Sequence, residues 1–244
     1  MKYILVDERI NSLCEAKLGE LGFTIFKLPK HPALPTAVCS HTDMLILRLG
    51  DYIFASREYR DRNSHLFGEL EAALSPLKFI YTADILGGEY PKDAKFNCLI
   101  MGKRIFCNRN IISKEVLDCA ERLGYDIISV KQGYPACTTL ALGENLALTA
   151  DRGMARALSS AGISVYLTEN SRNIKLPPHE YGFIGGCCHR VASDLLIFGN
   201  PDSYEYFGEL KAAFDTMGGR VIALDSGADC LFDLGGAVSY DNGI

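Results

Sequence analysis

The sequence predicts a mixed α/β protein built as a closed ring of five similar units, a pseudo-fivefold α/β propeller. A pattern of strand, tight turn, strand, helix and strand recurs along the chain, and 244 residues divided among five units give about 49 residues each. The N-terminal segment lacks the opening strand of this pattern, whereas the C-terminal segment has strands without a helix. Joining the two segments would complete one unit and remove exposed sheet edges, which favours closure. No flexible linker separates the units, so a single domain over residues 1–244 is expected.

The unit between residues 137 and 167 displays the pattern in full. Two apolar runs flank a turn that begins at Gly143, as in two strands joined by a tight connection. Asp151 is a helix cap, because its side chain can accept hydrogen bonds from free backbone N–H groups in the first turn. Gly162 ends the helix by adopting a left-handed conformation, and the apolar run 163–167 is the third strand.

The other units follow the same order of elements. The second unit has predicted strands 41–47 and 52–54, helix 60–74 and closing strand 78–81. The third has strands 98–101 and 104–107, helix 112–123 and closing strand 126–131. The fifth has strands 188–192 and 195–198, helix 203–217 and closing strand 221–224. The split unit combines strand 3–6, helix 10–21 and strand 23–28 with C-terminal strands 230–234 and 237–240.

Composition excludes several classes of partner. The net charge of −5 and the isoelectric point near 5.6 leave no clustered basic surface of the kind that binds nucleic acid. No run of 18 apolar residues is present, so no membrane span is predicted, and the N-terminus does not resemble a signal peptide. Nine cysteines, an odd number without an export signal, predict reduced thiols in a cytoplasmic protein.

Polar and thiol residues stand at the start of the opening strand in every unit. They are Cys39 to Asp43, Asn97-Cys98, Cys137 to Thr139, Cys187 to Arg190, and Asp229-Cys230. In a ring, equivalent positions lie at one end of the central axis, so these residues are expected to converge on one pocket. A single cysteine there is best explained as a small apolar residue at a crowded axis. Strand propensity does not explain the aspartates, because aspartate is depleted in strands.

The five-unit plan and three short motifs resemble the pentein superfamily, which includes arginine deiminase, agmatine deiminase and dimethylarginine dimethylaminohydrolase. His41-Thr42-Asp43-Met44 resembles the H-x-D strand of these enzymes, and Cys137-Thr138 resembles their catalytic C-[ST] strand. The stretch from Leu224 to Leu231, Leu-Asp-Ser-Gly-Ala-Asp-Cys-Leu, resembles their carboxylate-bearing L-[DE]-G-G-D-V segment. This last match requires a circular permutation that preserves the cyclic order of the units.

The resemblance implies a cysteine-dependent hydrolase or transferase that acts on an amidine, a guanidine or a related C–N substrate through a covalent thiol intermediate. Cys137 would be the nucleophile and His41 would transfer protons, while Asp43 or Asp229 would orient the imidazole or bind a donor on the substrate. The thiol would require a cationic neighbour, either His41 or Arg190, to lower its pKa. The implied partner is a small-molecule substrate, and neither a cofactor nor a metal is expected.

One departure from the family pattern bears on the substrate. In the guanidine-modifying members a carboxylate stands in the unit after the cysteine unit, but here that place carries no acid and ends in Arg190, which would repel a cation. Cys188 follows a glycine run and competes with Cys137 as the nucleophile; Cys137 ranks first on its placement relative to His41. The substrate-binding residues expected on this basis are Asp43, Cys188, His189, Arg190 and Asp225.

Two further classes remain open, because fold alone does not fix function. Pentein relatives include a non-catalytic ribosome anti-association factor, and a binding module of that kind should carry an exposed patch and no reactive thiol. Alternatively, cysteine, histidine and aspartate side chains gathered at one pole could bind a soft metal such as Zn²⁺. The chain has no C-x₂-C pair with finger-like spacing, so a metal site would depend wholly on the ring.

Overall fold

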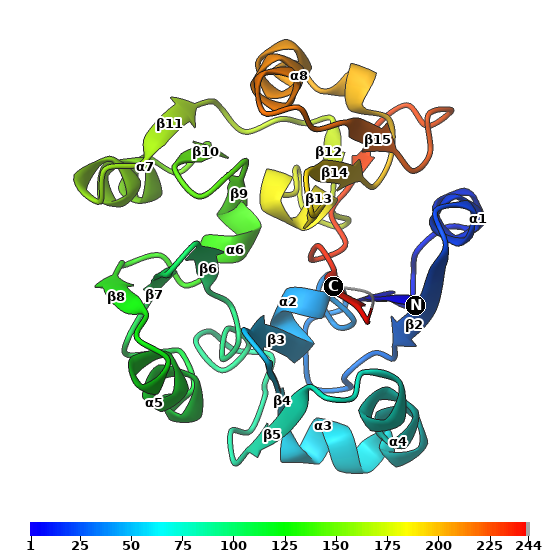
Figure 1. Cartoon of the computed structure of the whole chain (residues 1–244), viewed down its shortest axis with the longest axis vertical. Helices are drawn as coiled ribbons and strands as arrows, with labels where there is room; N and C mark the ends of the chain where they lie inside the picture. The colour runs from blue at the N-terminus through cyan, green and yellow to red at the C-terminus, as the bar shows by residue number, and fades with distance from the viewer. Residues whose placement is uncertain (243–244) are drawn as a thin grey trace.

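Residues 1–242 are described by a computed structural model in which five three-stranded sheets surround the centre of the molecule (Figure 1). Each sheet has the same topology, with a middle strand antiparallel to the first strand and parallel to the third. The first strands are β17 (Val238–Asp241), β3 (Ile46–Leu49), β6 (Leu99–Met101), β9 (Thr139–Ala141) and β13 (Cys188–Val191). The middle strands are β1 (Lys2–Asp7), β4 (Tyr52–Ser56), β7 (Arg104–Cys107), β10 (Leu146–Thr149) and β14 (Asp194–Ile197). The third strands are β2 (Phe23–Leu28), β5 (Lys78–Thr82), β8 (Asp126–Ser129), β11 (Ser164–Leu167) and β15 (Val221–Ala223).

Helices cover the outside of the sheets, as Figure 1 shows. They are α1 (Ser12–Glu20), α3 (Arg57–Arg62) with α4 (Ser64–Ala73), α5 (Lys114–Arg122), α7 (Arg152–Ser160) and α8 (Phe207–Thr216). Shorter segments are α2 (Thr42–Leu45), α6 (Pro135–Thr138), η1 (Ile184–Cys187) and η2 (Pro201–Ser203), and a small parallel pair joins β12 (Ile174–Lys175) to β16 (Leu231–Phe232). Within residues 1–242, no helix is long and apolar enough to cross a membrane.

The two ends of the chain pair as predicted. Tyr3 lies opposite Tyr240 and Leu5 opposite Val238 in the antiparallel ladder between β1 and β17. The predicted α/β class is therefore confirmed. The five sheets have no strand ladder in common among the described residues, so they stay separate and do not form one closed barrel.

Helix α7 illustrates how local sequence sets an element. Asp151 accepts a hydrogen bond from the Met154 backbone N–H at 2.7 Å, as predicted for its cap, and Gly162 follows the helix with a φ of 77°. Met154 and Leu158, one turn apart, are fully buried against the sheet side. Truncating Leu158 to alanine would cost about 2–5 kcal/mol of folding free energy through lost burial and a residual cavity.

Three predicted elements differ from the structure. The helix expected over 60–74 is two helices, α3 and α4, that meet at Asn63. The strand expected over 41–47 begins with a single helical turn, α2, so His41 precedes β3, just as Cys137 lies in the turn α6 before β9. The strand expected over 230–234 is only β16, and it pairs with β12 instead of joining the split unit.

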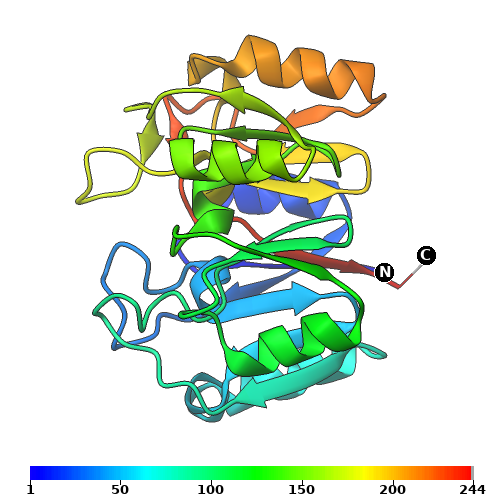
Figure 2. The same ribbon diagram turned by 90° about the vertical axis from the view of Figure 1, so that its left-hand side faces the viewer.

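Loops that connect successive sheets gather at one end of the molecule, and the termini lie at the other (Figure 2). The loop end includes residues 29–41, 83–97 and 168–182. The helical turns of α2 and α6 begin directly after inter-sheet connections, so they place their side chains near the centre of the molecule on the loop side.

Candidate active site

Two cavities lie near the centre of the molecule, one toward each end. The thiol cavity, of about 470 Å³, is lined by Cys137, His41, Asp233 and side chains of the connecting loops. The arginine cavity, of about 490 Å³, is lined by residues that include Arg48 and Arg190. Asp43 lines the arginine cavity and also contacts Cys137, so this residue lies between the two.

Cys137 is buried at the third position of α6, a turn that begins with Pro135, whose fixed φ suits the start of a helix. Its Sγ lies 2.7 Å from Asp43 Oδ2 and 3.0 Å from the Asn97 side-chain nitrogen. The same Asn97 nitrogen lies 3.0 Å from Asp43 Oδ2, while its oxygen accepts a hydrogen bond from the Ala136 backbone N–H at 2.9 Å. This last bond fixes the orientation of the Asn97 amide, whose nitrogen contacts both the Cys137 thiol and the Asp43 carboxylate.

The electrostatic environment keeps the Cys137 thiol neutral in the free protein. Burial raises its pKa well above the ordinary value, and the charges of Asp43 and Asp233 raise it further. Burial also raises the pKa of Asp43 to about 6, against the opposing effects of the His41 charge and the hydrogen bond from Cys137. The expectation that a cationic neighbour lowers the thiol pKa is wrong for this state, because carboxylates are the nearer charges and Arg190 lines the other cavity.

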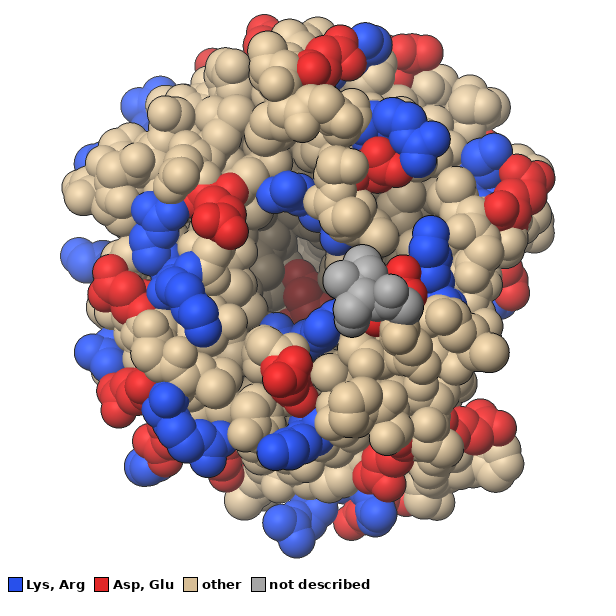
Figure 3. Space-filling model, in the orientation of Figure 1, with Lys and Arg blue, Asp and Glu red and all other residues tan. Residues whose placement is uncertain are grey.

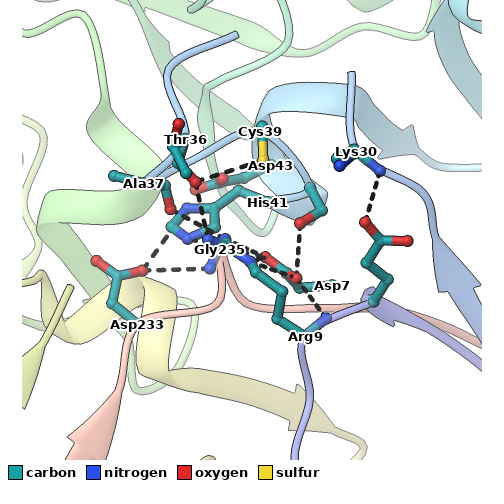
Figure 4. A network of polar contacts seen from close by, with 12 residues as sticks. Asp7, Arg9, Lys30, Thr36, Ala37, Cys39, His41, Asp43, Asp233 and Gly235 are labelled. Atoms are coloured by element: carbon teal, nitrogen blue, oxygen red, sulfur yellow. Dashed lines mark hydrogen bonds and ion pairs between the residues drawn. The ribbon is translucent and has the colours of Figure 1, made fainter. Parts of the chain in front are cut away.

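His41 lies between two carboxylates, as Figure 4 shows. Its Nε2 is 4.0 Å from Asp7 Oδ2 and its Nδ1 is 3.9 Å from Asp233 Oδ1. The side chain is only 1% exposed, and neither ring nitrogen has a hydrogen-bond partner in the described part of the chain. A buried imidazole with both nitrogens unengaged is suited to taking and giving a proton inside the cavity.

The two carboxylates beside His41 differ in how they are held. Asp7 is bound by Arg9 through the guanidinium, at 2.6 Å from Nη2 to Oδ2, and by the Ser40 hydroxyl at 2.8 Å. Its charge is thus already compensated by a cation. Asp233 accepts hydrogen bonds from the backbone N–H groups of Phe183 at 2.8 Å and Gly235 at 3.2 Å, and it lines the thiol cavity. Asp233 is therefore the carboxylate available to a ligand.

Two glycines make this arrangement possible. A Cβ at Gly186 would lie 1.9 Å from Asp233 Oδ1, so only glycine lets the backbone approach the carboxylate this closely. Gly235 has a φ of 69°, in the left-handed region, and a Cβ there would lie 2.5 Å from the His41 Cβ. The backbone around Asp233 and His41 is therefore packed without room for side chains.

The sequence-predicted site residues separate into three places. Cys137 and His41 line the thiol cavity together, with Asp43 bonded to the thiol. A second group lines the arginine cavity: Cys188, His189 and Arg190. The last two, Asp229 and Asp225, line neither cavity: Asp229 is exposed, and Asp225 accepts a hydrogen bond from the Asn11 side chain at 2.9 Å.

The placement of Asp229 corrects the predicted carboxylate partner. Asp229 lies in the exposed turn that precedes β16, the strand that pairs with β12. Asp233, four residues after Asp229, is the carboxylate that lies near His41. A sequence signal for Asp233 is the pair Gly235-Gly236, since Leu-Gly-Gly-Ala-Val at 234–238 fits the glycine pair of the family segment better than residues 224–231 do. Asn97, also missed as a site residue, was among the polar residues at strand starts.

The arginine cavity is visible as the central hollow in Figure 3, with basic side chains at its rim and an acidic one at its base. Arg48 donates to the Ser239 backbone oxygen, and the His189 Nε2 lies 2.8 Å from the Ser239 hydroxyl. Burial and the charge of Arg48 lower the pKa of His189 to about 4, so this imidazole is neutral at pH 7. Arg190 is exposed and makes no ion pair within residues 1–242.

The described residues contain no group of three or more histidine, cysteine, aspartate and glutamate side chains placed to hold a metal ion. All nine cysteines are buried and free of disulfides.

Comparison with known protein families identifies the family to which the chain belongs. A model of a family of unknown function, DUF6873, matches residues 5–238, nearly the whole chain. The chain belongs to this family. None of the curated proteins compared with this DUF6873 member matches its sequence.

Solved structures supply the fold. Dimethylarginine dimethylaminohydrolase from Pseudomonas aeruginosa, a mutant in complex with citrulline, superposes with a TM-score of 0.55 at 13% identity, over 92% of each chain. Inosamine-phosphate amidinotransferase from Streptomyces griseus gives a TM-score of 0.51 at 14% identity, over 92% of this chain and 75% of the other. Agmatine deiminase from C. jejuni gives 0.52 at 11% identity, over 91% and 86%. These proteins are pentein superfamily members, so this DUF6873 protein has the pentein fold that its sequence resembles.

Proposed function

We propose that this protein is a cysteine-dependent hydrolase or amidinotransferase that acts on an amidine or guanidine through a covalent thiol intermediate. The observation that carries the proposal is the meeting, at one cavity, of the Cys137 thiol and of His41 beside Asp233, with Asp43 hydrogen-bonded to the thiol from behind the cavity wall. Carboxylates on both sides of a thiol favour a substrate that is planar, cationic and rich in N–H donors.

We further propose that the five sheets are the blades of a pentein propeller with pseudo-fivefold symmetry, and that the substrate reaches the axis from the loop end. The common topology of the sheets and the pairing of β1 with β17 support this arrangement. A reducing compartment such as the cytoplasm would keep the nine buried thiols free.

The proposed reaction balances in two steps. In the first, Cys137 Sγ forms a bond to the amidinium carbon, its proton passes to His41 directly or by way of Asp43, and the C–N bond breaks as His41 gives this proton to the leaving nitrogen. In the second, His41 takes a proton from water, the oxygen bonds to the carbon, and the C–S bond breaks to restore the thiol. A guanidinium and water thus give a urea and an ammonium ion. In an amidinotransferase an acceptor amine takes the place of water.

The substrate itself would activate the nucleophile. In the free protein the carboxylates raise the pKa of Cys137, so a preformed thiolate is disfavoured. A cation bound in the thiol cavity beside Asp233 offsets the negative field of these carboxylates and favours the thiolate at the moment when it is needed. Arg190 does not repel a cation at this cavity, because it lines the other one.

One test is turnover and trapping with simple guanidines. The expected result is release of ammonia or amine from an alkylguanidine, with an intermediate attached to Cys137 that is detected by intact-protein mass spectrometry after acid quenching. Absence of turnover and of any adduct across alkylguanidines and amidines, in a protein shown to be folded, would overturn the enzymatic proposal.

A non-catalytic binding module is the second candidate, and one observation favours it. A buried thiol with a raised pKa is what a structural cysteine shows. The two candidates separate on whether a cationic ligand increases the reactivity of Cys137, since a structural thiol has no reason to respond.

A further inference from the structure

We infer that the arginine cavity is a second ligand site, which binds a zwitterion with its ammonium group toward Asp43 and its carboxylate toward Arg48 and Arg190. This site lies toward the opposite end of the molecule from the thiol cavity, and its ligand is bound without being transformed. The inference therefore goes beyond the proposed function and does not depend on it.

The charged side chains of the arginine cavity are separated by sign. Asp43 is the only acidic residue among the described residues that line it, and Arg48 and Arg190 line it as well. Figure 3 shows basic side chains at the rim of this hollow and acidic atoms at its base. A simple cation is repelled at the rim and a simple anion at the base. A ligand with a positive inner end and a negative outer end is complementary to both.

Arg48 is a half-buried cation without an acidic partner. It makes no ion pair within residues 1–242. Its guanidinium donates to the backbone oxygens of Ser239 and, from Nε at 3.1 Å, of Gly50, and its central carbon lies 5.3 Å from the centroid of the Tyr240 ring. These contacts hold the guanidinium in place but leave its charge uncompensated, and burial lowers its pKa. A ligand carboxylate supplies the missing counter-charge through charge-assisted hydrogen bonds.

The inner part of the cavity contains polar atoms that lack partners. Thr42 is 1% exposed and lines the cavity, and its hydroxyl has no hydrogen-bond partner in the described part of the chain. The same is true of Asp43 Oδ1, and no lysine or arginine of residues 1–242 pairs with this carboxylate. Buried polar groups are nearly always hydrogen-bonded, so these atoms point to a ligand. An ammonium group has three N–H donors and can satisfy a carboxylate and a hydroxyl together.

The wall between the two charged ends is largely apolar. Ile46, Leu99 and Leu140 contribute to it, and the cavity volume of about 490 Å³ is typical of a small-molecule site. The Cα atoms of Asp43 and Arg48 are separated by the end of α2 and the start of β3, about 13 Å at most. The two side chains occupy part of this span, and an ω-amino carboxylic acid of about four to six carbons fills the remainder.

A ligand in this position affects Cys137 through Asp43. The charge of Asp43 raises the pKa of the Cys137 thiol, whose Sγ lies 2.7 Å from Asp43 Oδ2. An ammonium group beside Asp43 offsets part of that charge. The bound zwitterion therefore makes the thiol more reactive without entering the thiol cavity, which also reports where the ligand binds.

The first test is isothermal titration of the full-length protein with 4-aminobutanoate, 5-aminopentanoate and 6-aminohexanoate. The tightest of the three should bind at least about tenfold more strongly than the unsubstituted acid and the amine of the same length, because each of these lacks one charged end. For the five-carbon compound these controls are pentanoate and pentylamine. Absence of binding by all three zwitterions, or equal binding of the matching acid or amine, would overturn the inference.

Substitutions locate the carboxylate of the ligand. Arg48→Gln should reduce the affinity at least about tenfold and Arg190→Gln at least about threefold, since the exposed charge is the more screened. Arg152→Gln, at an exposed position on α7 outside the cavity, is the matched control and should leave the affinity unchanged. Thermal melts verify folding of Arg48→Gln, and the exposed Arg190 gives a test without loss of packing. Wild-type affinity in either folded variant would overturn the inference.

The reactivity of Cys137 locates the ammonium group. With the zwitterion at saturation, labelling of Cys137 by the neutral reagent chloroacetamide should become at least about threefold faster. Protection of Cys137 would place the ligand in the thiol cavity, and an unchanged rate would show that the ammonium group does not lie beside Asp43; either result would overturn the inference. None of these measurements involves turnover of a guanidine, so the proposed function is decided separately.

Discussion

The two central cavities differ in charge, and Asp43, which lines the arginine cavity, connects them through its contact with Cys137. The thiol cavity contains Asp93 and Asp233 and no arginine or lysine among the described lining residues, whereas the arginine cavity contains Arg48 and Arg190. A cation is therefore attracted to the loop end of the molecule and repelled at the end that carries the termini.

Each cavity also contains a cysteine and a histidine, yet the two pairs differ in chemistry. Cys137 and His41 lie among carboxylates, and His41 has both ring nitrogens unengaged. Cys188 and His189 are adjacent in sequence, but His189 bonds to Ser239 and is kept neutral by burial and by a neighbouring arginine. Residue type alone thus does not identify a reactive pair; the charges around it do.

The largest expected difference concerns the two cysteines. Cys137→Ala should reduce turnover of an alkylguanidine by at least about a thousandfold, because the nucleophile is lost. Cys188→Ala is the matched control and should change the rate by less than about threefold. Steady-state rates of both variants at saturating substrate identify the nucleophile. A large loss of activity in Cys188→Ala with activity retained in Cys137→Ala would show that Cys188 is the nucleophile.

The second-largest expected difference in turnover is between substitutions of His41 and of His189. His41→Asn should lower turnover by about 10²–10⁴-fold through the loss of proton transfer, and Asp233→Asn by a similar or smaller factor. His189→Asn, in the other cavity, should leave the rate within about twofold. Circular dichroism and thermal melts would verify folding. An unchanged rate in His41→Asn would remove the imidazole from the mechanism.

Asp43 provides a prediction for stability against pH. Its folded pKa of about 6 lies above the unfolded value of about 3.9, so the folded state binds more protons between these values and loses stability as the pH rises through them. Asp43→Asn removes this loss and should be more stable than the wild type at pH 7 by up to about 3 kcal/mol, with a much smaller difference at pH 4.

Urea unfolding of both proteins at pH 4 and pH 7 measures this difference directly. The same substitution should reduce turnover, since the amide cannot accept the thiol proton. An equal stability difference at the two pH values would show that Asp43 does not titrate as its burial implies.

The smallest expected effect is at the rim of the arginine cavity. Arg190→Gln should change the apparent affinity for a cationic guanidine by less than about twofold, because this exposed charge lies at the opposite mouth and is screened by salt. Titration at low and at physiological ionic strength would check it. A gain of tenfold or more would place the entrance for substrate at the arginine end.

The sequence predicted the repeated sheets, the pairing of the termini, and the placement of His41 and Cys137 at one cavity. The repeated sheets follow from local patterns, such as Asp151 before a helix and apolar runs separated by turns, whereas the meeting of His41 and Cys137 follows from closure of the ring and from the resemblance to the pentein superfamily. It did not predict Asp233 in place of Asp229, because that choice depends on the pairing of β16 with the distant β12. The sequence also did not predict that the polar residues near the starts of the opening strands would be divided between two cavities. Side chains a residue or two apart, such as His41 and Asp43, face opposite ends, and only the three-dimensional packing of the helical turns reveals this.

The central claim is that the carboxylates of the thiol cavity make Cys137 reactive toward cations and inert toward neutral reagents. Chloroacetamidine and chloroacetamide offer a matched test, since they share a leaving group and differ in charge. Limited reaction at pH 7 followed by peptide mapping measures the labelling rate of each cysteine. We expect chloroacetamidine to label Cys137 at least about tenfold faster than chloroacetamide does, and we expect this preference to disappear in Asp43→Asn. Equal labelling of Cys137 by the two reagents, or labelling first at Cys188, would contradict the account.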